Sequence, residues 1–214
     1  MSNGADQAIE ASPSLPLERS TLVNRNRILG FWLFLASECI IFASLIGTYL
    51  ALQGQYGDTT GPKEAFDLVF VFIMTFVLLT SSLTGVLSTV GLQRGNFRMM
   101  HIWLFITILL GTTFLAMQIY EFVHYYSIGL TFTSSAYGSA FYALVGFHGL
   151  HVAFGLLWLT ILQLQSLNFF AFTRGRGLHK QNASKLYIAG LYWHFIDVVW
   201  VLIFTIVYLM GKVG

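Results

Sequence analysis

The sequence has little charge and almost no cysteine, and both shortages restrict what the protein can be. Only 9% of its 214 residues are Asp, Glu, Lys or Arg, whereas an ordinary soluble domain carries about 25%. A typical soluble globular domain is therefore excluded. The net charge of +2 gives no basis for binding nucleic acid. The single cysteine, Cys39, cannot form an internal disulfide or a cysteine metal framework, and we expect it to be a small, buried apolar side chain.

Hydrophobic residues are abundant and make up 56% of the chain. Crossing a bilayer takes about 20 mostly apolar residues, and five stretches qualify: 28–52, 66–92, 101–126, 136–166 and 184–210. The sequence therefore predicts an all-α, polytopic membrane protein, a bundle of five transmembrane helices. The polar residues 1–24 lack the apolar run of a signal peptide and are interpreted as a mobile tail, and residues 25–214 as one membrane domain.

The basic residues predict an orientation, because Lys and Arg collect in cytoplasmic loops. With five spans, the N-terminal tail and the second and fourth loops share one side and hold nine basic residues, whereas the opposite side holds two. The nine are Arg19, Arg25, Arg27, Arg94, Arg98, Arg174, Arg176, Lys180 and Lys185, and the two are Lys63 and Lys212. We therefore expect a cytoplasmic N-terminus and an external C-terminus.

Ionisable residues inside the predicted spans form a second pattern. Such residues are rare in membranes and mark functional or structural interiors. At 1.5 Å per residue, five of them fall near the bilayer midplane and form a predicted intramembrane polar network: Glu38, His148, His151, His194 and Asp197. Two others, Glu121 and His124, lie nearer the outer surface and form a predicted outer-side polar pair.

The spacing of these residues indicates how they face one another. His148 and His151 are three residues apart, as are His194 and Asp197, so each pair shares a helix face. Gly146 and Gly149 would let another helix approach the histidine pair closely. A carboxylate taken out of water must find a partner or take up a proton, which favours a shared interhelical network.

Three interpretations of this network remain open. A metal or haem site is the first, but the di-iron pattern needs two Glu-x-x-His motifs, and the chain has one, Glu121 with His124. A proton path is the second, since Glu, Asp and His carry protons in pumps. A structural network that fixes helix packing is the third, and the residues alone favour it slightly.

Several long motifs resemble subunit III of the haem–copper terminal oxidases, in its bacterial five-span form. They are "SAYGSAFYALVGFHGLHVAFG" (135–155), "LYWHFIDVVWVLIFTIVYLMG" (191–211), "GFWLFLASECIIFASL" (30–45), which includes Glu38, and "MQIYEFVHY" (117–125). The resemblance runs from about residue 25 to residue 214 and implies a subunit of a proton-pumping cytochrome c oxidase, which reduces oxygen to water in the bacterial cytoplasmic membrane.

The resemblance also implies which roles this chain lacks. It implies no catalytic residue, metal ligand or redox cofactor here, because the family's haems and copper belong to subunits I and II. It implies direct packing beside subunit I, a complex that also contains subunit II and a small subunit IV, and bound phospholipid that supports proton uptake and lasting activity. Arg25, Arg27, Arg174 and Arg176 are candidate contacts for lipid head groups.

Two other functions are kept as alternatives. The chain could be subunit III of a quinol oxidase, because subunit III does not bind the electron donor. In a different class, it could be an independent membrane transporter or proton channel, which would conduct without partner subunits.

Overall fold

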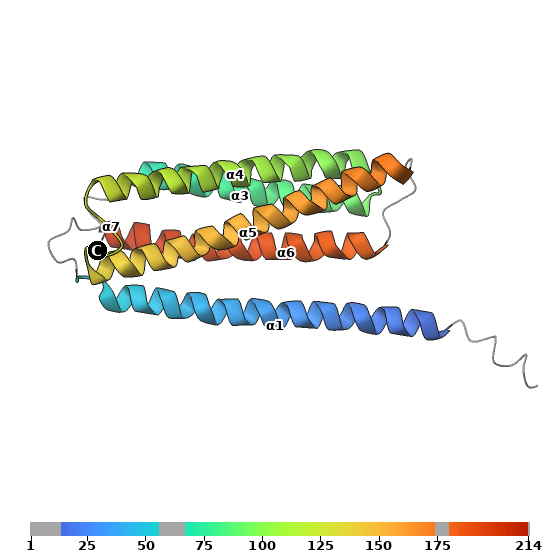
Figure 1. The fold of residues 1–214 in the computed structure, drawn as a ribbon, viewed down its shortest axis with the longest axis horizontal. Coiled ribbons are helices and arrows are strands. Elements are labelled where there is room, and N and C mark those ends of the chain that lie inside the picture. The colour runs from blue at the N-terminus through green and yellow to red at the C-terminus, as the bar shows by residue number, and fades with distance from the viewer. Residues whose placement is uncertain (1–13, 56–66, 174–179, 214) are drawn as a thin grey trace, which may run out of the picture. The chain divides into compact units, whose positions relative to one another are not determined.

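The computed structural model describes residues 14–55, 67–173 and 180–213, and all the regular secondary structure in these ranges is helical, with no strand (Figure 1). The elements are α1 (Ser14–Leu52), α3 (Leu68–Gln93), α4 (Phe97–Ser127), α5 (Ala136–Thr173), α6 (Lys180–Ile203), the π-helix η1 (Phe204–Leu209) and α7 (Met210–Val213). Five helical segments in these ranges are long and apolar enough to cross a membrane: Ile28–Leu52, Leu68–Gln93, Phe97–Ser127, Ala136–Leu167 and Lys185–Leu209. The predicted five-span, all-α fold is confirmed.

The chain divides into two compact units, Met1–Cys39 and Ile40–Gly214, with the boundary inside α1. In the first unit, α1 begins at Ser14, within the range that the sequence assigns to a tail. The expected burial of Cys39 is wrong, because its side chain is exposed. Exposure of a small apolar side chain on a membrane-spanning helix is compatible with lipid, which solvates it as well as a protein core would.

Local signals in the loops set where two of the helices begin. The Asp67 carboxylate accepts hydrogen bonds from the backbone N–H groups of Val69 and Phe70, at 3.0 and 3.4 Å, and caps α3. The Asn96 side chain accepts from the Met99 N–H at 3.1 Å and caps α4. Between α3 and α4, Gly95 has a φ of 69°, a conformation that glycine adopts at little cost.

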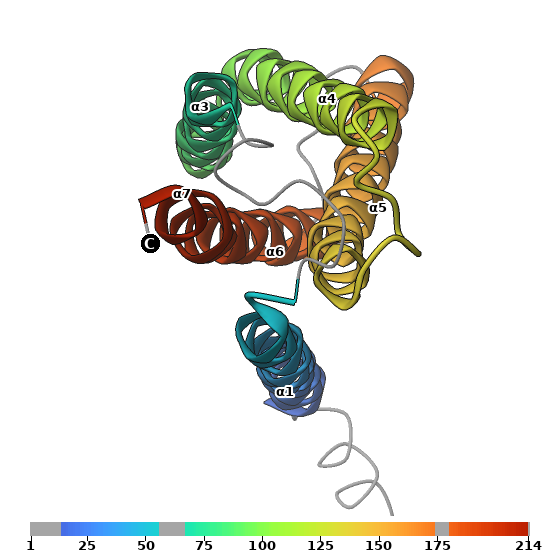
Figure 2. The same ribbon diagram turned by 90° about the vertical axis from the view of Figure 1, so that its left-hand side faces the viewer.

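Four helices of the second unit form a closed bundle. α3 packs on α4, α4 on α5, α5 on α6, and α6 back on α3, and Figure 2 shows them as the four sides of a ring. Large side chains fill the interior: Trp193, Trp200, Phe114 and Leu78 are all less than 2% exposed. The outward faces are apolar as well, which is the pattern of helices whose surroundings are lipid or other membrane helices.

Candidate functional site

Two tryptophans of α6 fix the register between α6 and α3 across the bundle interior. Trp193 donates its Nε1–H to Ser81 Oγ at 3.1 Å, and Trp200 donates to Thr75 Oγ1 at 3.0 Å. Each hydroxyl in turn donates to a carbonyl of its own helix, at 2.6 and 2.9 Å respectively. Buried indole N–H groups need such acceptors, so these two contacts determine how the two helices are aligned.

Ser82 lies in the same interface and joins the predicted pair on α6. Its Oγ is 2.7 Å from His194 Nδ1, and its hydroxyl also interacts with the Asp197 carboxyl. Asp197 is only 3% exposed, and within the described ranges neither of its oxygens makes a hydrogen bond of ordinary geometry. The structure therefore brings His194 and Asp197 together around Ser82, and we call these three residues the α3–α6 polar cluster.

His148 lies deeper in the bundle and is surrounded by rings. It is fully buried, and its ring stacks on Trp200 with centroids 5.1 Å apart and an interplanar angle of 29°. Phe114 approaches it edge-on at 6.2 Å. Among the side chains that the structure describes, neither nitrogen of His148 has a hydrogen-bond partner, so His148 contacts α6 by stacking rather than through the α3–α6 polar cluster.

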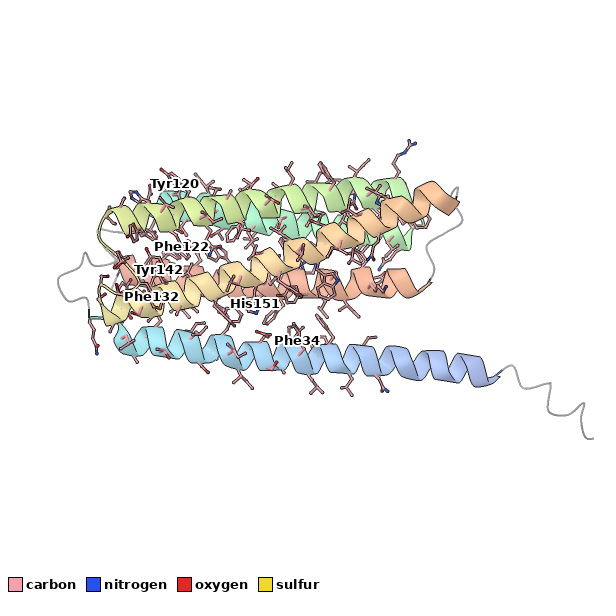
Figure 3. All side chains as sticks on the ribbon, viewed as in Figure 1. Phe34, Tyr120, Phe122, Phe132, Tyr142 and His151 are labelled. Atoms are coloured by element: carbon pink, nitrogen blue, oxygen red, sulfur yellow. The ribbon has the colours of Figure 1, made fainter. Side chains whose placement is uncertain are left out.

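His151, labelled in Figure 3, is one turn further along α5 and bonds to its own helix. Its Nδ1 lies 2.8 Å from the Phe147 carbonyl oxygen. The ring of Phe42, from the part of α1 that belongs to the second unit, lies 5.2 Å from the His151 ring and 6.3 Å from the His148 ring. The two histidines therefore share one aromatic neighbour.

The structure brings only two of the five residues of the predicted intramembrane network together. His194 and Asp197 share the α3–α6 polar cluster, whereas His148 and His151 are held by rings and by a backbone carbonyl. Glu38 lies in the first unit, Met1–Cys39, and the other four lie in the second, so its membership of the network stays a prediction.

The predicted outer-side pair of Glu121 and His124 is split by the structure. Glu121 is 3% exposed and points into the bundle, whereas His124 is exposed. Glu121 Oε1 accepts from the Tyr125 hydroxyl at 2.5 Å, and Oε2 accepts from the Tyr208 hydroxyl at 3.1 Å. Glu121 is thus paired with two tyrosines, one from its own helix and one from η1.

A second tyrosine pair lies in the same half of the bundle. The hydroxyls of Tyr49 and Tyr137 are 3.1 Å apart, and Tyr49 also reaches the Val207 carbonyl at 3.5 Å. Both rings are completely buried. These contacts connect the end of α1 and the start of α5 to η1, next to the residue that bonds Glu121.

Sequence reasoning missed Ser82, Tyr125, Tyr208 and Gln118. The Gln118 side chain donates to the Val145 carbonyl at 2.9 Å, and a Cβ atom at Gly149 would meet its amide nitrogen at 2.8 Å. Gly149 therefore does allow a close approach, but to a side chain of α4. For Tyr125, the four-residue spacing from Glu121 was an available signal.

The predicted lipid contacts lie beyond what the structure describes. Arg174 and Arg176 fall in the range 174–179, and the side chains of Arg25 and Arg27 are likewise outside the described residues. Their contact with head groups stays a prediction. Among the described residues, no three His, Cys, Asp or Glu side chains come close enough together to hold a metal ion.

The five apolar helices and the buried polar side chains define a multi-span helical membrane protein with an ionisable interior. Comparison with known proteins narrows this class. The family model described as cytochrome c oxidase subunit III matches residues 13–212.

Relatives of both oxidase types are similar over nearly the whole chain. Cytochrome c oxidase subunit 3 of Bacillus subtilis is 52% identical over 206 residues, which is 96% of this chain and 96% of that protein. The subunit of the same name from Bacillus sp. strain PS3 is 50% identical over 205 residues, again 96% of each chain. Quinol oxidase subunit 3 of Bacillus subtilis is 41% identical over 209 residues, 98% of this chain and 99% of that protein.

This chain belongs to the cytochrome c oxidase subunit III family. It is a subunit III of a respiratory terminal oxidase, and thus part of a multi-subunit oxidoreductase complex in a bacterial membrane.

Proposed function

We propose that this chain serves a proton-pumping cytochrome c oxidase of the cytoplasmic membrane, in which it is a non-catalytic subunit. The choice of cytochrome c over quinol as the electron donor rests on the percentage of identical residues that this chain shares with relatives of each type. The cytochrome c oxidase subunits of two Bacillus strains and of Alkalihalophilus pseudofirmus are 50–52% identical to this chain, whereas the matching quinol oxidase subunits are 41–45% identical.

Oxygen consumption by the complex tests this choice. The oxidase is purified from its native membrane through a tag on this chain, and reduced cytochrome c and a reduced quinol are each supplied as electron donor. We expect turnover with cytochrome c and none with quinol. The second candidate is a quinol oxidase, because a quinol oxidase subunit 3 is 41% identical over 98% of this chain. Turnover with quinol alone would assign the chain to this second type.

The non-catalytic role is supported by how the histidines of the bundle are engaged. His194 is bonded to Ser82, His151 to a backbone carbonyl, and His148 is enclosed by Trp200 and Phe114. Of the three, His148 would have to displace its ring neighbours to bind a haem or copper. We therefore propose that the redox centres reside in subunits I and II, and that this chain packs directly on subunit I in a complex that also holds a small subunit IV.

We propose further that this chain holds phospholipid and sustains proton uptake during turnover. The apolar outward faces of its helices are suited to acyl chains, and Arg25, Arg27, Arg174 and Arg176 would bind anionic head groups. Phospholipid analysis of the purified complex, with and without substitution of these arginines by Gln, tests the contact. If the phospholipid content is unchanged after all four substitutions, the proposed contact between these arginines and lipid head groups is wrong.

We propose that Glu38 contributes to the same role, the support of lasting activity in the complex. Because Gln keeps the size and hydrogen-bonding capacity of Glu, we expect Glu38→Gln to preserve assembly, whereas Glu38→Ala weakens association by about 1–3 kcal/mol through unpaired partner groups. Either change should shorten the period of steady oxygen consumption more than it lowers the initial rate. Loss of the initial rate in a fully haem-loaded Glu38→Gln complex would instead make Glu38 part of the chemistry.

A proton channel that works alone is the alternative of another class. The test is proton flux through the isolated chain in liposomes under an imposed gradient. We expect no flux above that of empty liposomes, and a specific flux without an electron donor would favour the channel.

A further inference from the structure

Asp197 differs from another buried carboxyl, that of Glu121, because the contacts described above do not explain how its carboxyl is stabilised in the bundle interior. It is 3% exposed, on the buried side of α6, and its two oxygens have no ordinary hydrogen bond within the described ranges. The hydroxyl of Ser82 is the group that interacts with it. An ionised carboxylate with so little support is costly in a protein interior, so a bound proton is the economical state of this side chain.

A small cavity lies at the same helix interface, about the size of a single water molecule. Three residues with hydroxyl groups line it, Ser88, Thr89 and Thr107, and so does His194. Two glycines, one on α3 and one on α6, leave the space open. Buried water needs two to four polar partners. Each of the three hydroxyls already donates to a backbone carbonyl, and its oxygen can still accept a hydrogen bond from water.

His194 connects the cavity to the carboxyl. Its Nδ1 is bonded to Ser82 Oγ at 2.7 Å, and the residue also lines the cavity, so Nε2 is the ring nitrogen that is available to water. A neutral imidazole donates from one nitrogen and accepts at the other, and a serine hydroxyl does both at one oxygen. The order cavity water, His194, Ser82, Asp197 is therefore a row of groups that each can pass on a proton.

We propose that Asp197 is an exchangeable proton-binding site inside the bundle, supplied from the cavity through His194 and Ser82. In the forward step, a proton from solvent reaches the cavity water, which passes a proton to Nε2 and remains water, the Nδ1 proton passes to Ser82 Oγ, and the hydroxyl proton of Ser82 passes to the carboxylate. The reverse sequence returns the proton to water, so no bond other than those to the moving protons changes. The site does not depend on the electron donor of the oxidase.

Glu121 provides an internal comparison. Its carboxyl is buried to the same degree, but both of its oxygens accept from tyrosine hydroxyls. Two donors stabilise the ionised form of Glu121, so its carboxyl has less need of a bound proton than that of Asp197.

Infrared spectroscopy of the purified oxidase complex tests the site. The complex is transferred from H₂O to D₂O, and the carbonyl band of each protonated carboxyl is followed as it shifts. We expect a band that is lost in Asp197→Asn and that remains in Glu121→Gln. In Ser82→Ala the Asp197 band should move in frequency and exchange several-fold more slowly, whereas Thr80→Ala, which removes a hydroxyl bonded only within α3, should leave it unchanged.

His194→Gln separates a relay from a structural contact. Gln can still donate a hydrogen bond to Ser82, but it cannot take up a proton at one atom while releasing one from another. We expect the Asp197 band to keep its frequency and to exchange several-fold more slowly. If Asp197→Asn fails to assemble, the frequency shift in Ser82→Ala still assigns the band.

Two results would overturn the proposal. One is a complex in which no protonated carboxyl band responds to Asp197→Asn or to Ser82→Ala, because Asp197 would then be ionised. The other is an Asp197 band whose exchange rate is the same in the unsubstituted complex, in Ser82→Ala and in His194→Gln.

Discussion

At the scale of single residues, side chains that look ordinary in the sequence determine how the bundle is aligned. Ser81 and Thr75 are small hydroxyl residues in an apolar helix, and each accepts an indole N–H while donating to its own backbone. A hydroxyl can make both bonds because it has one donor and two lone pairs. The aligned pairs place His194 and Asp197 opposite Ser82.

Trp193→Phe should destabilise the chain chiefly through the lost hydrogen bond. Phe keeps most of the ring but leaves Ser81 Oγ without its donor, at a cost of about 1–3 kcal/mol. Unfolding of the purified chain in mixed micelles, as sodium dodecyl sulfate is increased, measures the difference. Trp158→Phe is the control, because the ring contacts of Trp158 with Phe154 and Tyr192 survive the change; an equal effect of both substitutions would contradict the account.

Gly111→Ala should be harmful at a site where one methyl group has no room. A Cβ atom there would meet Leu156 at 2.7 Å and the Trp193 ring at 2.8 Å, and such overpacking costs about 1–3 kcal/mol. Gly85→Ala is the matched control, since the nearest atom to its Cβ, on Thr107, is 3.8 Å away. The temperature at which the chain leaves the solubilised complex should fall for Gly111→Ala and stay within a degree or so for Gly85→Ala.

At the scale of the elements, hydropathy was sufficient to predict the five spans and their approximate ends. Pairs three residues apart correctly indicated a shared face for His194 and Asp197. The same reasoning failed to separate Glu121 from His124, because side chains three residues apart differ by about 60° around a helix. That rotation is enough to bury one and expose the other.

Partners on other helices could not be predicted, because spacing along one helix does not say which residue of another helix faces it. Ser82 resembles any other hydroxyl of α3 in the sequence, which contains several. The π-helix η1 is equally hidden, since its residues, FTIVYL, are apolar and ordinary. Only the three-dimensional structure shows that the Tyr208 hydroxyl, on this π-helix, donates a hydrogen bond to Glu121.

Tyr208→Phe tests whether this contact holds η1 against α4. Removing the hydroxyl leaves Glu121 Oε2 without its donor, and we expect a loss of about 1–3 kcal/mol in stability. Tyr126→Phe is the control, because Tyr126 is 70% exposed. Hydrogen exchange of the backbone amides in 204–209 should accelerate in Tyr208→Phe alone, and unchanged exchange there would contradict the contact's role.

At the scale of the whole molecule, the distribution of basic residues predicts how the chain lies in the membrane. Single cysteines placed at Arg94, Arg98 and Lys63 in a Cys39→Ser background, and labelled with an impermeant thiol reagent on intact cells, test the orientation. We expect labelling at Lys63 only, because the other two positions belong to the basic, cytoplasmic side. If the cysteine at position 94 or 98 is labelled from outside, the predicted orientation is wrong and the chain lies in the membrane the other way round.

The central claim is that this chain belongs to a haem-containing oxidase and holds no redox centre itself. The most direct measurement is the haem and copper content of two preparations: the complex isolated through a tag on this chain, and the chain after it has been gently separated from that complex. We expect haem and copper in the complex, and neither a haem absorption band nor stoichiometric metal in the separated chain. A separated chain that reproducibly retained one haem or one metal ion, or a tagged chain that never recovered a haem-containing partner, would contradict the account.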